Sequence, residues 1–362
     1  MSDIFAADIF SDSQPKFSDV DAITANQIIG VLRNGFSNYS GNLISIKKSG
    51  AFEINSGNYR VDTDAGCILL KRHCIDHAKS EVFEKQQKLM SILRNEGCLV
   101  PTPILCDDET YLFQTGKNEL WMAMEFVDGH FFSGDRSSIV NTARAIGQFH
   151  SNLKRCQIDL FPDRRYINIS DIDREVFNEI ILGDRSVLEK FSGPDAILLA
   201  QNRHLIASAW QSVHDFQAIF LADEPGFIHI DLHPHNILMQ DDHVAALIDF
   251  DSLMIGPMNM MLGFCSYKLL RQVVQKEGVG RSDLYSIILR EFLESFYSIF
   301  PQIKDCRNNL GWFALTEICR RLAIIFRLTL RENNCAWNHV MKLHINGIKE
   351  VVILFELPLV VE

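Results

Sequence analysis

The sequence predicts an α+β protein with a small, β-rich N-terminal lobe and a larger, mostly helical C-terminal lobe. Three observations predict this class. Residues 43–126 alternate short β-prone runs with turns that contain Gly and Asn, whereas residues 139–330 carry long runs of apolar residues at helical spacing. Within the helical region, residues 226–251 form a block in which short apolar strands lead into loops rich in Asp and His. We place the lobe boundary near Val127, which divides the chain into residues 1–127 and 128–362.

The composition is that of a soluble globular protein, with 362 residues, 47% hydrophobic and 22% charged. The net charge of -11 argues against an extended surface for nucleic acid. The nine cysteines include no C-x-x-C pair, which fits reduced thiols in the cytoplasm. Residues 1–16 lack the pattern of a signal peptide, and the apolar residues 351–361 are too few to cross a bilayer. We therefore expect a cytoplasmic protein without nucleic-acid or membrane partners, and the sequence leaves its oligomeric state open.

The first lobe is predicted to begin with a helix over residues 18–34, where apolar residues recur at three- and four-residue steps. Short β-prone runs follow, and Asp64-Ala65-Gly66 is typical of a hairpin turn. A break at Pro101-Thr102-Pro103 precedes two further strands. The predicted strands are residues 43–47, 51–54, 59–63, 67–72, 111–115 and 120–126.

Asn55-Ser56-Gly57-Asn58 is predicted to form a turn between two of these strands. Successive backbone N–H groups in such a turn can point at phosphate oxygens. Most turns of this composition only reverse the chain, so both interpretations stay open at this point. Asn55, Ser56 and Gly57 are our candidate phosphate contacts.

Lys71 lies late in the predicted strand 67–72, where its ammonium group can reach the α- and β-phosphates of a nucleotide. An ordinary surface lysine beside Arg72 would show the same local pattern. The helix predicted over residues 80–95 should carry a carboxylate that pairs with Lys71. Glu81 and Glu84 both qualify by type, and the helical wheel does not decide between them. Glu84 is the candidate that we carry forward.

The stretch Met124-Glu125-Phe126-Val127-Asp128-Gly129 changes from an apolar strand to a polar connector that contains Gly. We interpret it as a hinge between the lobes. The backbone N–H and C=O groups of Glu125 and Val127 are candidates for binding the adenine of ATP. A simple junction between a strand and a loop would have the same composition.

The second lobe is predicted to be mostly helical. His150 lies on the apolar face of its first helix, so we expect a hydrogen-bonded core residue there rather than a ligand. The predicted helices are residues 139–153, 173–183, 194–221, 284–300 and 313–330.

The chemistry is concentrated in His229-Ile230-Asp231 and the residues that follow. Asn236 comes five positions after Asp231, and Asp249 ends the next strand. In phosphoryl transfer from ATP, one carboxylate accepts the proton of the attacking hydroxyl, while an amide oxygen and a second carboxylate bind Mg²⁺. We therefore predict Asp231 as the general base and Asn236 and Asp249 as Mg²⁺ ligands. If the strand continues regularly, Asp251 faces the opposite side from Asp249. If the strand ends there, Asp251 can turn towards the metal.

Two other interpretations use the same residues. His229 and Asp231 with His233 or His235 resemble part of a two-His, one-carboxylate iron site. Helical spacing after residue 280 argues against the all-β scaffold on which such sites usually lie. Alternatively, Asp231 and Asp249 cap loops in a nucleotide-binding regulator that catalyses nothing. The Asp, Asn and Asp spacing favours a kinase, in which His229 supports the loop by hydrogen bonding.

Residues 229–238 and 247–251 resemble the motifs of the aminoglycoside phosphotransferase and choline kinase superfamily. Its members phosphorylate hydroxyl groups of small molecules with ATP and Mg²⁺ on a bilobal protein-kinase-like fold. The resemblance implies that Asp231 is the catalytic base and that Asn236 and Asp249 bind the metal. It also favours the N-acetylhexosamine kinase and homoserine-kinase-like branches, and hence a sugar, amino sugar or amino alcohol as acceptor. The further matching segments are residues 53–59, Lys71, residues 100–103, 124–129 and 143–150.

One position departs from the family pattern. The family usually continues with an Asp-Leu-Ala-like triplet whose Asp braces the catalytic loop, and here the triplet is Met261-Leu262-Gly263. The rigidity of the loop is therefore in question. The acceptor is expected to bind the helical lobe, where the candidate contacts are Trp312, Glu317, Arg320, Arg321 and Trp337.

Overall fold

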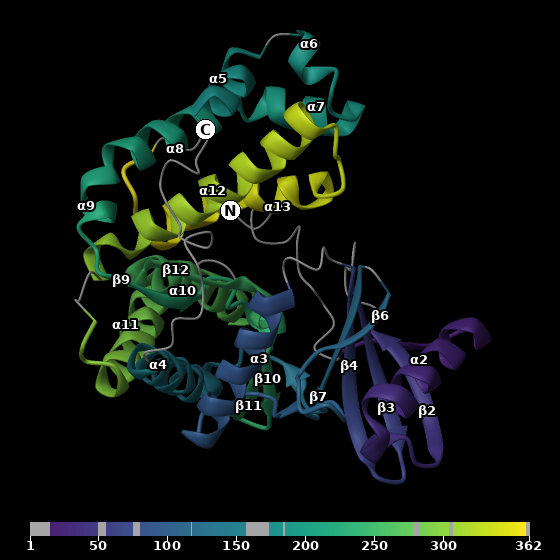
Figure 1. The fold of residues 1–362 in the computed structure, drawn as a ribbon. Coiled ribbons are helices and arrows are strands. Elements are labelled where there is room, and N and C mark those ends of the chain that lie inside the picture. The colour runs from purple at the N-terminus through teal and green to yellow at the C-terminus, as the bar shows by residue number, and fades with distance from the viewer. Residues whose placement is uncertain are drawn as a thin grey trace.

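The computed structural model describes residues 15–49, 56–74, 80–116, 118–156, 174–183, 185–277, 282–303 and 307–359. Figure 1 shows an antiparallel sheet formed by the N-terminal part of the chain and a larger helical part formed by the remainder. The predicted α+β class and its β-rich and helical parts are confirmed.

The N-terminal sheet is antiparallel throughout, with strand order β1-β2-β3-β4-β7-β5, and β6 also pairs with β7. Thr63 pairs with Gly66, which leaves Asp64 and Ala65 as the turn of the predicted hairpin. The strands are β1 (Phe17–Asp19), β2 (Leu43–Ser49), β3 (Ser56–Thr63), β4 (Gly66–Cys74), β5 (Pro103–Ile104), β6 (Phe113–Gly116) and β7 (Glu119–Glu125).

Helix α2 (Ala22–Gly35) packs on this sheet and begins four residues later than residue 18, the predicted start. Asp21 caps the helix, because its carboxylate accepts the backbone N–H of Thr24 at 2.8 Å. The residues before the cap are extended and pair with β2 as the edge strand β1. The N-cap therefore fixes a boundary that apolar spacing alone did not show.

Helix α3 (Ser80–Asn95) has the predicted bounds and contacts both parts of the protein. Its Leu89, Met90 and Leu93 are buried in the hydrophobic core of the helical part. In Figure 1 α3 lies between the sheet and helix α4 (Ile139–Arg155). Its rotation about its own axis is therefore determined by neighbours on two sides.

The remaining helices form the larger part of the molecule, in which α11 packs on α4 and α12 packs on α10. The region predicted as helical at 194–221 contains three helices, because the chain bends at Asn202 and Phe216. None of the described helices is both long enough and apolar enough to cross a membrane. The helices are α5 (Arg174–Leu182), α6 (Arg185–Leu188), α7 (Gly193–Gln201), α8 (Arg203–Asp215), α9 (Gln217–Leu221), α10 (Met258–Glu277), α11 (Ser282–Ile299), α12 (Leu310–Glu332) and α13 (Met341–Leu354).

Short strands position the motif residues. Strand β9 pairs with β12, while β10 pairs with both β11 and β8, so residues 230–236 form a loop that is held at both ends. Asp249 lies in the connection from β11 to β12. The elements are β8 (His130–Phe131), β9 (Pro225–His229), η6 (Pro234–Asn236), β10 (Ile237–Gln240), β11 (His243–Leu247), η7 (Phe250–Ser252) and β12 (Leu253–Pro257).

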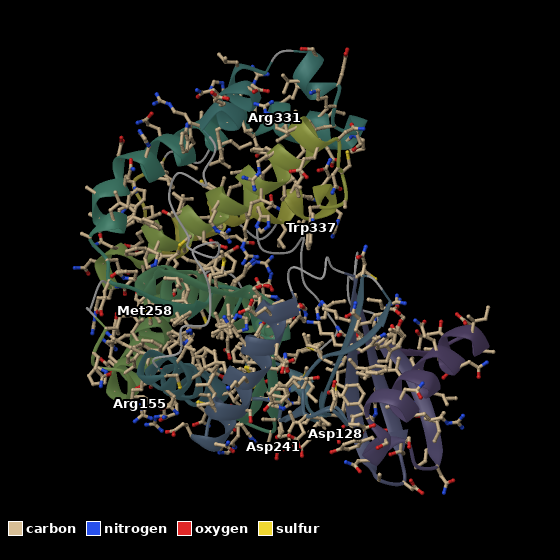
Figure 2. All side chains as sticks on the ribbon, in the orientation of Figure 1. Asp128, Arg155, Asp241, Met258, Arg331 and Trp337 are labelled. Atoms are coloured by element: carbon tan, nitrogen blue, oxygen red, sulfur yellow. The ribbon has the colours of Figure 1, made fainter. Side chains whose placement is uncertain are left out.

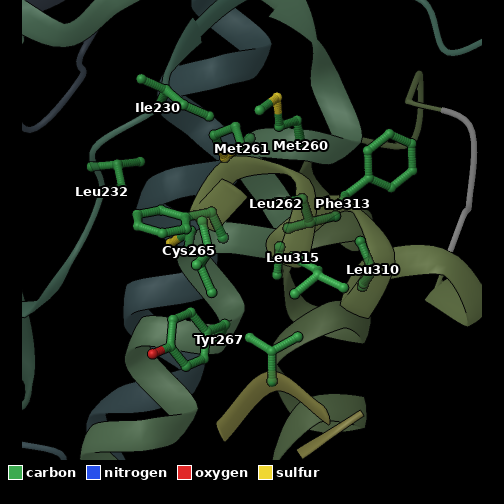
Figure 3. Close-up of a cluster of buried hydrophobic side chains, with 14 of the residues drawn as sticks. Ile230, Leu232, Met260, Met261, Leu262, Cys265, Tyr267, Leu310, Phe313 and Leu315 are labelled. Atoms are coloured by element: carbon green, nitrogen blue, oxygen red, sulfur yellow. The ribbon is translucent and has the colours of Figure 1, made fainter. Parts of the chain in front are cut away.

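An apolar cluster supports the loop that carries Asp231. Ile230 and Leu232, its neighbours, are 2% and 0% exposed and belong to the same core as Met261. Figure 3 shows Ile230 beside Met260 and Met261, with Phe313 further along the cluster. At Met261, where the resemblance implied a bracing Asp, this chain therefore provides apolar packing.

Candidate active site

A cavity of about 1040 Å³ lies between the sheet and the helical part. This volume is at the upper end of the range for small-molecule sites. Six of the predicted site residues line it together, although they come from four separate segments of the chain. These residues are Lys71, Glu125, Val127, Asp231, Asn236 and Asp249.

The carboxylate of Asp231 is held by a cation from the helical part. Arg321 Nη2 donates to Asp231 Oδ1 at 2.8 Å, and His233 Nε2 lies 3.6 Å from Oδ2. Burial acts to raise the pKa of Asp231, but the Arg321 guanidinium and then His233 outweigh it and hold the pKa well below its usual value. Asp231 is therefore ionised, as a general base must be before it accepts a proton.

Asn236 is fixed to the same loop. Its Nδ2 donates to the backbone carbonyl of Asp231 at 2.8 Å, and its backbone carbonyl accepts from Ile248 N at 3.0 Å. The side chain is 5% exposed and lines the cavity. Since the amide nitrogen is engaged, the amide oxygen is the atom that Asn236 offers to a ligand.

Asp249 and Asp251 both bind Lys71. The Lys71 ammonium donates to Asp249 Oδ1 at 2.9 Å and to Asp251 Oδ2 at 2.8 Å. Burial acts to lower the pKa of Lys71, but these two carboxylates raise it above its usual value. Asp249 has a left-handed backbone (φ 63°), and the single turn η7 brings Asp251 to the same side. Asp251 therefore faces the cavity, the second of the two orientations considered from the sequence.

The predicted ion pair between Lys71 and a glutamate of α3 is wrong for the described conformation. Both carboxylate oxygens of Glu84 accept the backbone N–H of Tyr111 at 3.0 Å, and Glu81 pairs with Lys85 at 2.7 Å. Packing on two sides turns α3 so that Gln87 lines the cavity instead, and Gln87 Nε2 lies 3.2 Å from the sulfur of Met122. Gln87 lies on the same helix face as the apolar residues Phe83 and Met90. That spacing could have predicted that Gln87, rather than Glu84, points inward.

The predicted turn is wrong for residues 56–58, while the phosphate contacts proposed for Ser56 and Gly57 stay a prediction. Ser56, Gly57 and Asn58 belong to strand β3 and pair with His73, Arg72 and Lys71 of β4. A Cβ atom on Gly57 would lie 2.8 Å from the ring of Tyr59, so packing explains this glycine. Asn55 lies outside the described residues, as does the strand predicted at 51–54.

The predicted hinge also borders the cavity. Glu125 N donates to Thr102 O at 2.9 Å and Phe126 N donates to Cys67 O at 3.2 Å, which fixes the chain up to Val127. The cavity wall beside the hinge is apolar, which suits the flat face of a ring such as adenine. The apolar lining residues here are Leu69, Met122, Met124, Phe126, Leu238 and Ile248.

Two buried histidines support the loop. His150 is 0% exposed; its Nε2 accepts from His229 N at 3.3 Å, and its Nδ1 lies 2.9 Å from Ile146 O. His229 Nε2 lies 3.0 Å from Ile248 O, which ties the loop to the strand before Asp249. Burial lowers the pKa of His150 to about 3 and also lowers that of His229, so both are neutral. The structural roles predicted for both histidines are confirmed.

The residues of the alternative iron site form no set of three metal ligands in the described part of the chain. His229 is bonded to a carbonyl as described above, and the ring of His235 packs against Phe131 with centroids 5.0 Å apart. In the part of the chain that the structure describes, no three His, Cys, Asp or Glu side chains are placed to hold a metal ion together.

Three of the five expected acceptor contacts line the cavity, namely Arg320, Arg321 and Trp337. Figure 2 shows Trp337 on the helical part, on the side that faces the sheet. Glu317 is fully buried and binds both arginines, while Trp312 packs on Phe216 with centroids 6.2 Å apart. The cavity also contains residues that no sequence motif indicated, because they lie on ordinary helix faces. These are Lys268, Arg271, Gln272 and His344.

The fold and the family comparison together support a small-molecule phosphotransferase of kinase-like architecture. The chain belongs to the phosphotransferase enzyme family, whose model matches residues 52–270, more than half of its length. No curated protein matches the chain.

Solved structures share the fold at low sequence identity. Spectinomycin phosphotransferase APH(9)-Ia in complex with ADP and spectinomycin is 15% identical, with a TM-score of 0.60 over 91% of this chain and 97% of that one. Amicoumacin kinase hAmiN in complex with AMP-PNP, Ca²⁺ and Ami is 12% identical, with a TM-score of 0.59 over 94% and 95%. A microcompartment-associated aminopropanol kinase is 15% identical, with a TM-score of 0.57 over 90% and 95%.

Proposed function

We propose that this protein is an ATP- and Mg²⁺-dependent kinase that transfers the γ-phosphoryl group to a hydroxyl of a small molecule. The observation that carries the proposal is the convergence of Lys71, Asp231, Asn236 and Asp249 on one cavity. In this assignment Val127 marks the boundary between a nucleotide-binding lobe, residues 1–127, and a catalytic and acceptor-binding lobe, residues 128–362.

The wall of the cavity fits ATP at two points. The backbone of Glu125 and Val127 and the apolar residues beside it suit the edge and the face of adenine. Lys71 is buried and already paired with two carboxylates, so its ammonium is held where phosphate oxygens would bind. ATP supplies the phosphoryl group that is transferred.

The oxygen atoms at the other end fit Mg²⁺. Asn236 offers an amide oxygen, and Asp249 and Asp251 offer carboxylates, which are the hard ligands that Mg²⁺ prefers. Bound there, Mg²⁺ would neutralise phosphate charge. We assign Asn236 and Asp249 as its ligands and Asp251 as an additional candidate.

Asp231 would act as the general base. It accepts the proton of the acceptor hydroxyl while the hydroxyl oxygen bonds to the γ-phosphorus and the bond to the β-phosphate oxygen breaks, leaving ADP. The contact with Arg321 fixes the orientation of the carboxylate. Such proton transfer is worth about 10²–10⁴ in rate.

The proposed acceptor is a small hydroxyl compound. The candidates are those expected from the sequence: a sugar, an amino sugar or an amino alcohol. Structures of similar fold bind spectinomycin or are named as aminopropanol and amicoumacin kinases, which supports a small hydroxylated acceptor.

A nucleotide-binding regulator without catalysis is the second candidate. It is favoured by one observation, the ion pair of Arg321 with the base that must receive a proton. If Arg321 makes Asp231 too weak a base, the protein would bind nucleotide normally but transfer its phosphate slowly or not at all.

ADP release across sugars, amino sugars, amino alcohols and aminoglycosides separates the two. The kinase predicts release with at least one acceptor and a loss of at least about a hundredfold in Asp231→Asn, with AMP-PNP binding retained. Asp215→Asn, at the exposed end of α8, is the matched control and should behave as wild type. Thermal stabilisation by ATP and Mg²⁺ without ADP release from any acceptor would favour the regulator.

A further inference from the structure

The helical wall of the cavity beyond Asp231 is lined by cations. Helices α10 and α12 contribute the cations Lys268, Arg271, Arg320 and Arg321 to the lining, and α13 contributes His344, which is neutral. Among the described residues, these three helices contribute no carboxylate to it. The charged side chains on the surface that would face the acceptor are therefore basic, although the whole chain has a net charge of -11.

The acids that partly neutralise these cations are buried behind them. Glu317 is 0% exposed and binds Arg320 Nε at 2.6 Å, and Glu350 is 1% exposed and binds Arg271 Nε at 2.7 Å. Neither glutamate lines the cavity. These acids therefore anchor the arginines from behind and leave positive charge on the cavity side.

Lys268 has no such anchor. Its ammonium lies 4.9 Å from the ring centre of Tyr267 and 5.5 Å from that of Phe264, and no described residue forms a hydrogen bond or ion pair with it. Burial and then the nearby Arg271 lower its pKa to about 7, against the opposing charge of Glu350. A lysine in this environment is destabilised in its charged form unless an anion joins it.

His344 adds no charge to this wall. It is 6% exposed, and burial followed by the charges of Arg321 and Lys268 holds its pKa well below the usual value. The ring is neutral and is available as a hydrogen-bonding group. A ligand that matches this wall must bring negative charge of its own.

We propose that the acceptor carries an anionic group, a carboxylate or a phosphate, that binds Lys268 and the neighbouring Arg271 of α10 while its hydroxyl lies at Asp231. The inference rests on the proposed kinase function, because it identifies the acceptor of that same site. It ranks sugar acids and sugar phosphates ahead of neutral sugars, and it ranks cationic amino sugars and amino alcohols last.

The test is calorimetric binding of four matched compounds to the full-length protein saturated with AMP-PNP and Mg²⁺. The compounds are glucose, glucosamine, glucuronate and glucose 6-phosphate, which vary the charge on one carbon skeleton. At least one anion should bind tenfold or more tightly than glucose, and which one does so distinguishes carboxylate from phosphate. Lys268→Met should abolish that preference, whereas Lys268→Arg should retain it.

Lys276→Met is the matched control, because Lys276 lies on the same helix, is exposed, and pairs with Asp135 at the surface. Thermal melting of each variant establishes that it is folded. The inference is overturned if neither anion binds more tightly than glucose, or if folded Lys268→Met retains the preference.

ADP release measured in parallel with ATP reports on the kinase function separately. Lys268-dependent binding of an anion without ADP release from any acceptor would contradict the kinase function and support the anion site. ADP release from glucose or glucosamine in preference to both anions would support a kinase and overturn the anion site.

Discussion

Arg321 Nη2 lies 2.8 Å from Asp231 Oδ1, although the two residues are 90 positions apart in the chain. Buried Glu317 accepts from Nε of the same guanidinium at 2.7 Å, so the arginine cannot turn away without breaking a second ion pair. The proposed base is thus oriented by a chain of charges that ends inside α12. This arrangement has consequences for activity at different pH values.

Arg321→Met should shift the acidic limb of the pH profile of kcat/KM to higher pH. Arg321 is the main influence that lowers the pKa of Asp231, and burial, which raises it, would then dominate. In the wild type Asp231 therefore stays ionised well below the usual carboxyl range, and activity is retained there. In the variant the carboxylate takes up its proton at higher pH, and activity falls earlier as the pH is lowered.

Initial rates between pH 4.5 and 8 with a confirmed acceptor measure this shift. Arg331→Met is the control, since Arg331 forms an ion pair with Glu179 on the outside of the helical part and should leave the profile unchanged. Coinciding profiles for Arg321→Met and wild type would contradict the role of Arg321.

Lys71→Met should weaken AMP-PNP binding in the presence of Mg²⁺ by tenfold or more, equivalent to about 1.4 kcal/mol. The substitution keeps much of the side-chain length but removes the charge that phosphates would meet, and it leaves Asp249 and Asp251 facing each other without a cation. Calorimetric titration gives the affinity. Lys85→Met, which removes only a surface pair with Glu81, serves as control, and equal affinities for the two variants would argue against the assigned nucleotide site.

Glu84→Ala should leave the KM for ATP within about twofold of wild type and lower the stability of the fold. Glu84 caps Tyr111 N rather than binding Lys71, so its loss costs about 1 kcal/mol of a local hydrogen bond. Thermal denaturation and steady-state kinetics measure the two effects. Glu84→Gln, which keeps one acceptor oxygen, should be the more stable variant. A large rise in the KM for ATP would instead support the ion pair between Glu84 and Lys71 that the sequence predicted.

The strongest sequence predictions were those in which short-range spacing determines geometry. Asp231 and Asn236 share one loop, and the side-chain amide of Asn236 donates to the backbone carbonyl of Asp231. The spacing of five residues therefore brings the two residues into contact. Asp249 lies two residues after the end of the adjoining strand β11, and the backbone N–H of Ile248 donates to the carbonyl of Asn236. A local pattern was sufficient to bring these residues to one cavity.

Features that depend on packing between distant elements were missed. The rotation of α3, which presents Gln87 instead of Glu84, is set by the sheet and α4 together. Strand β3 extends to Ser56 because β4 offers pairing partners up to His73, which overrides a composition typical of a turn. Lys268 lies on an ordinary helix face, and only the packing of α10 and α12 brings it to the cavity.

Met261→Asp, which restores the residue type usual in the family, should destabilise this protein rather than improve it. Met261 is 1% exposed among apolar side chains that include Ile230 and Leu232, so a carboxylate there would be buried without a partner. We expect a loss of at least about 3 kcal/mol of stability. Met261→Leu, a substitution of similar volume, should cost less than about 1.5 kcal/mol and retain activity. Denaturant unfolding and ADP release compare the two variants; a stable and faster Met261→Asp enzyme would show that the loop lacks a polar brace, whereas an unstable one would show that apolar packing has replaced it.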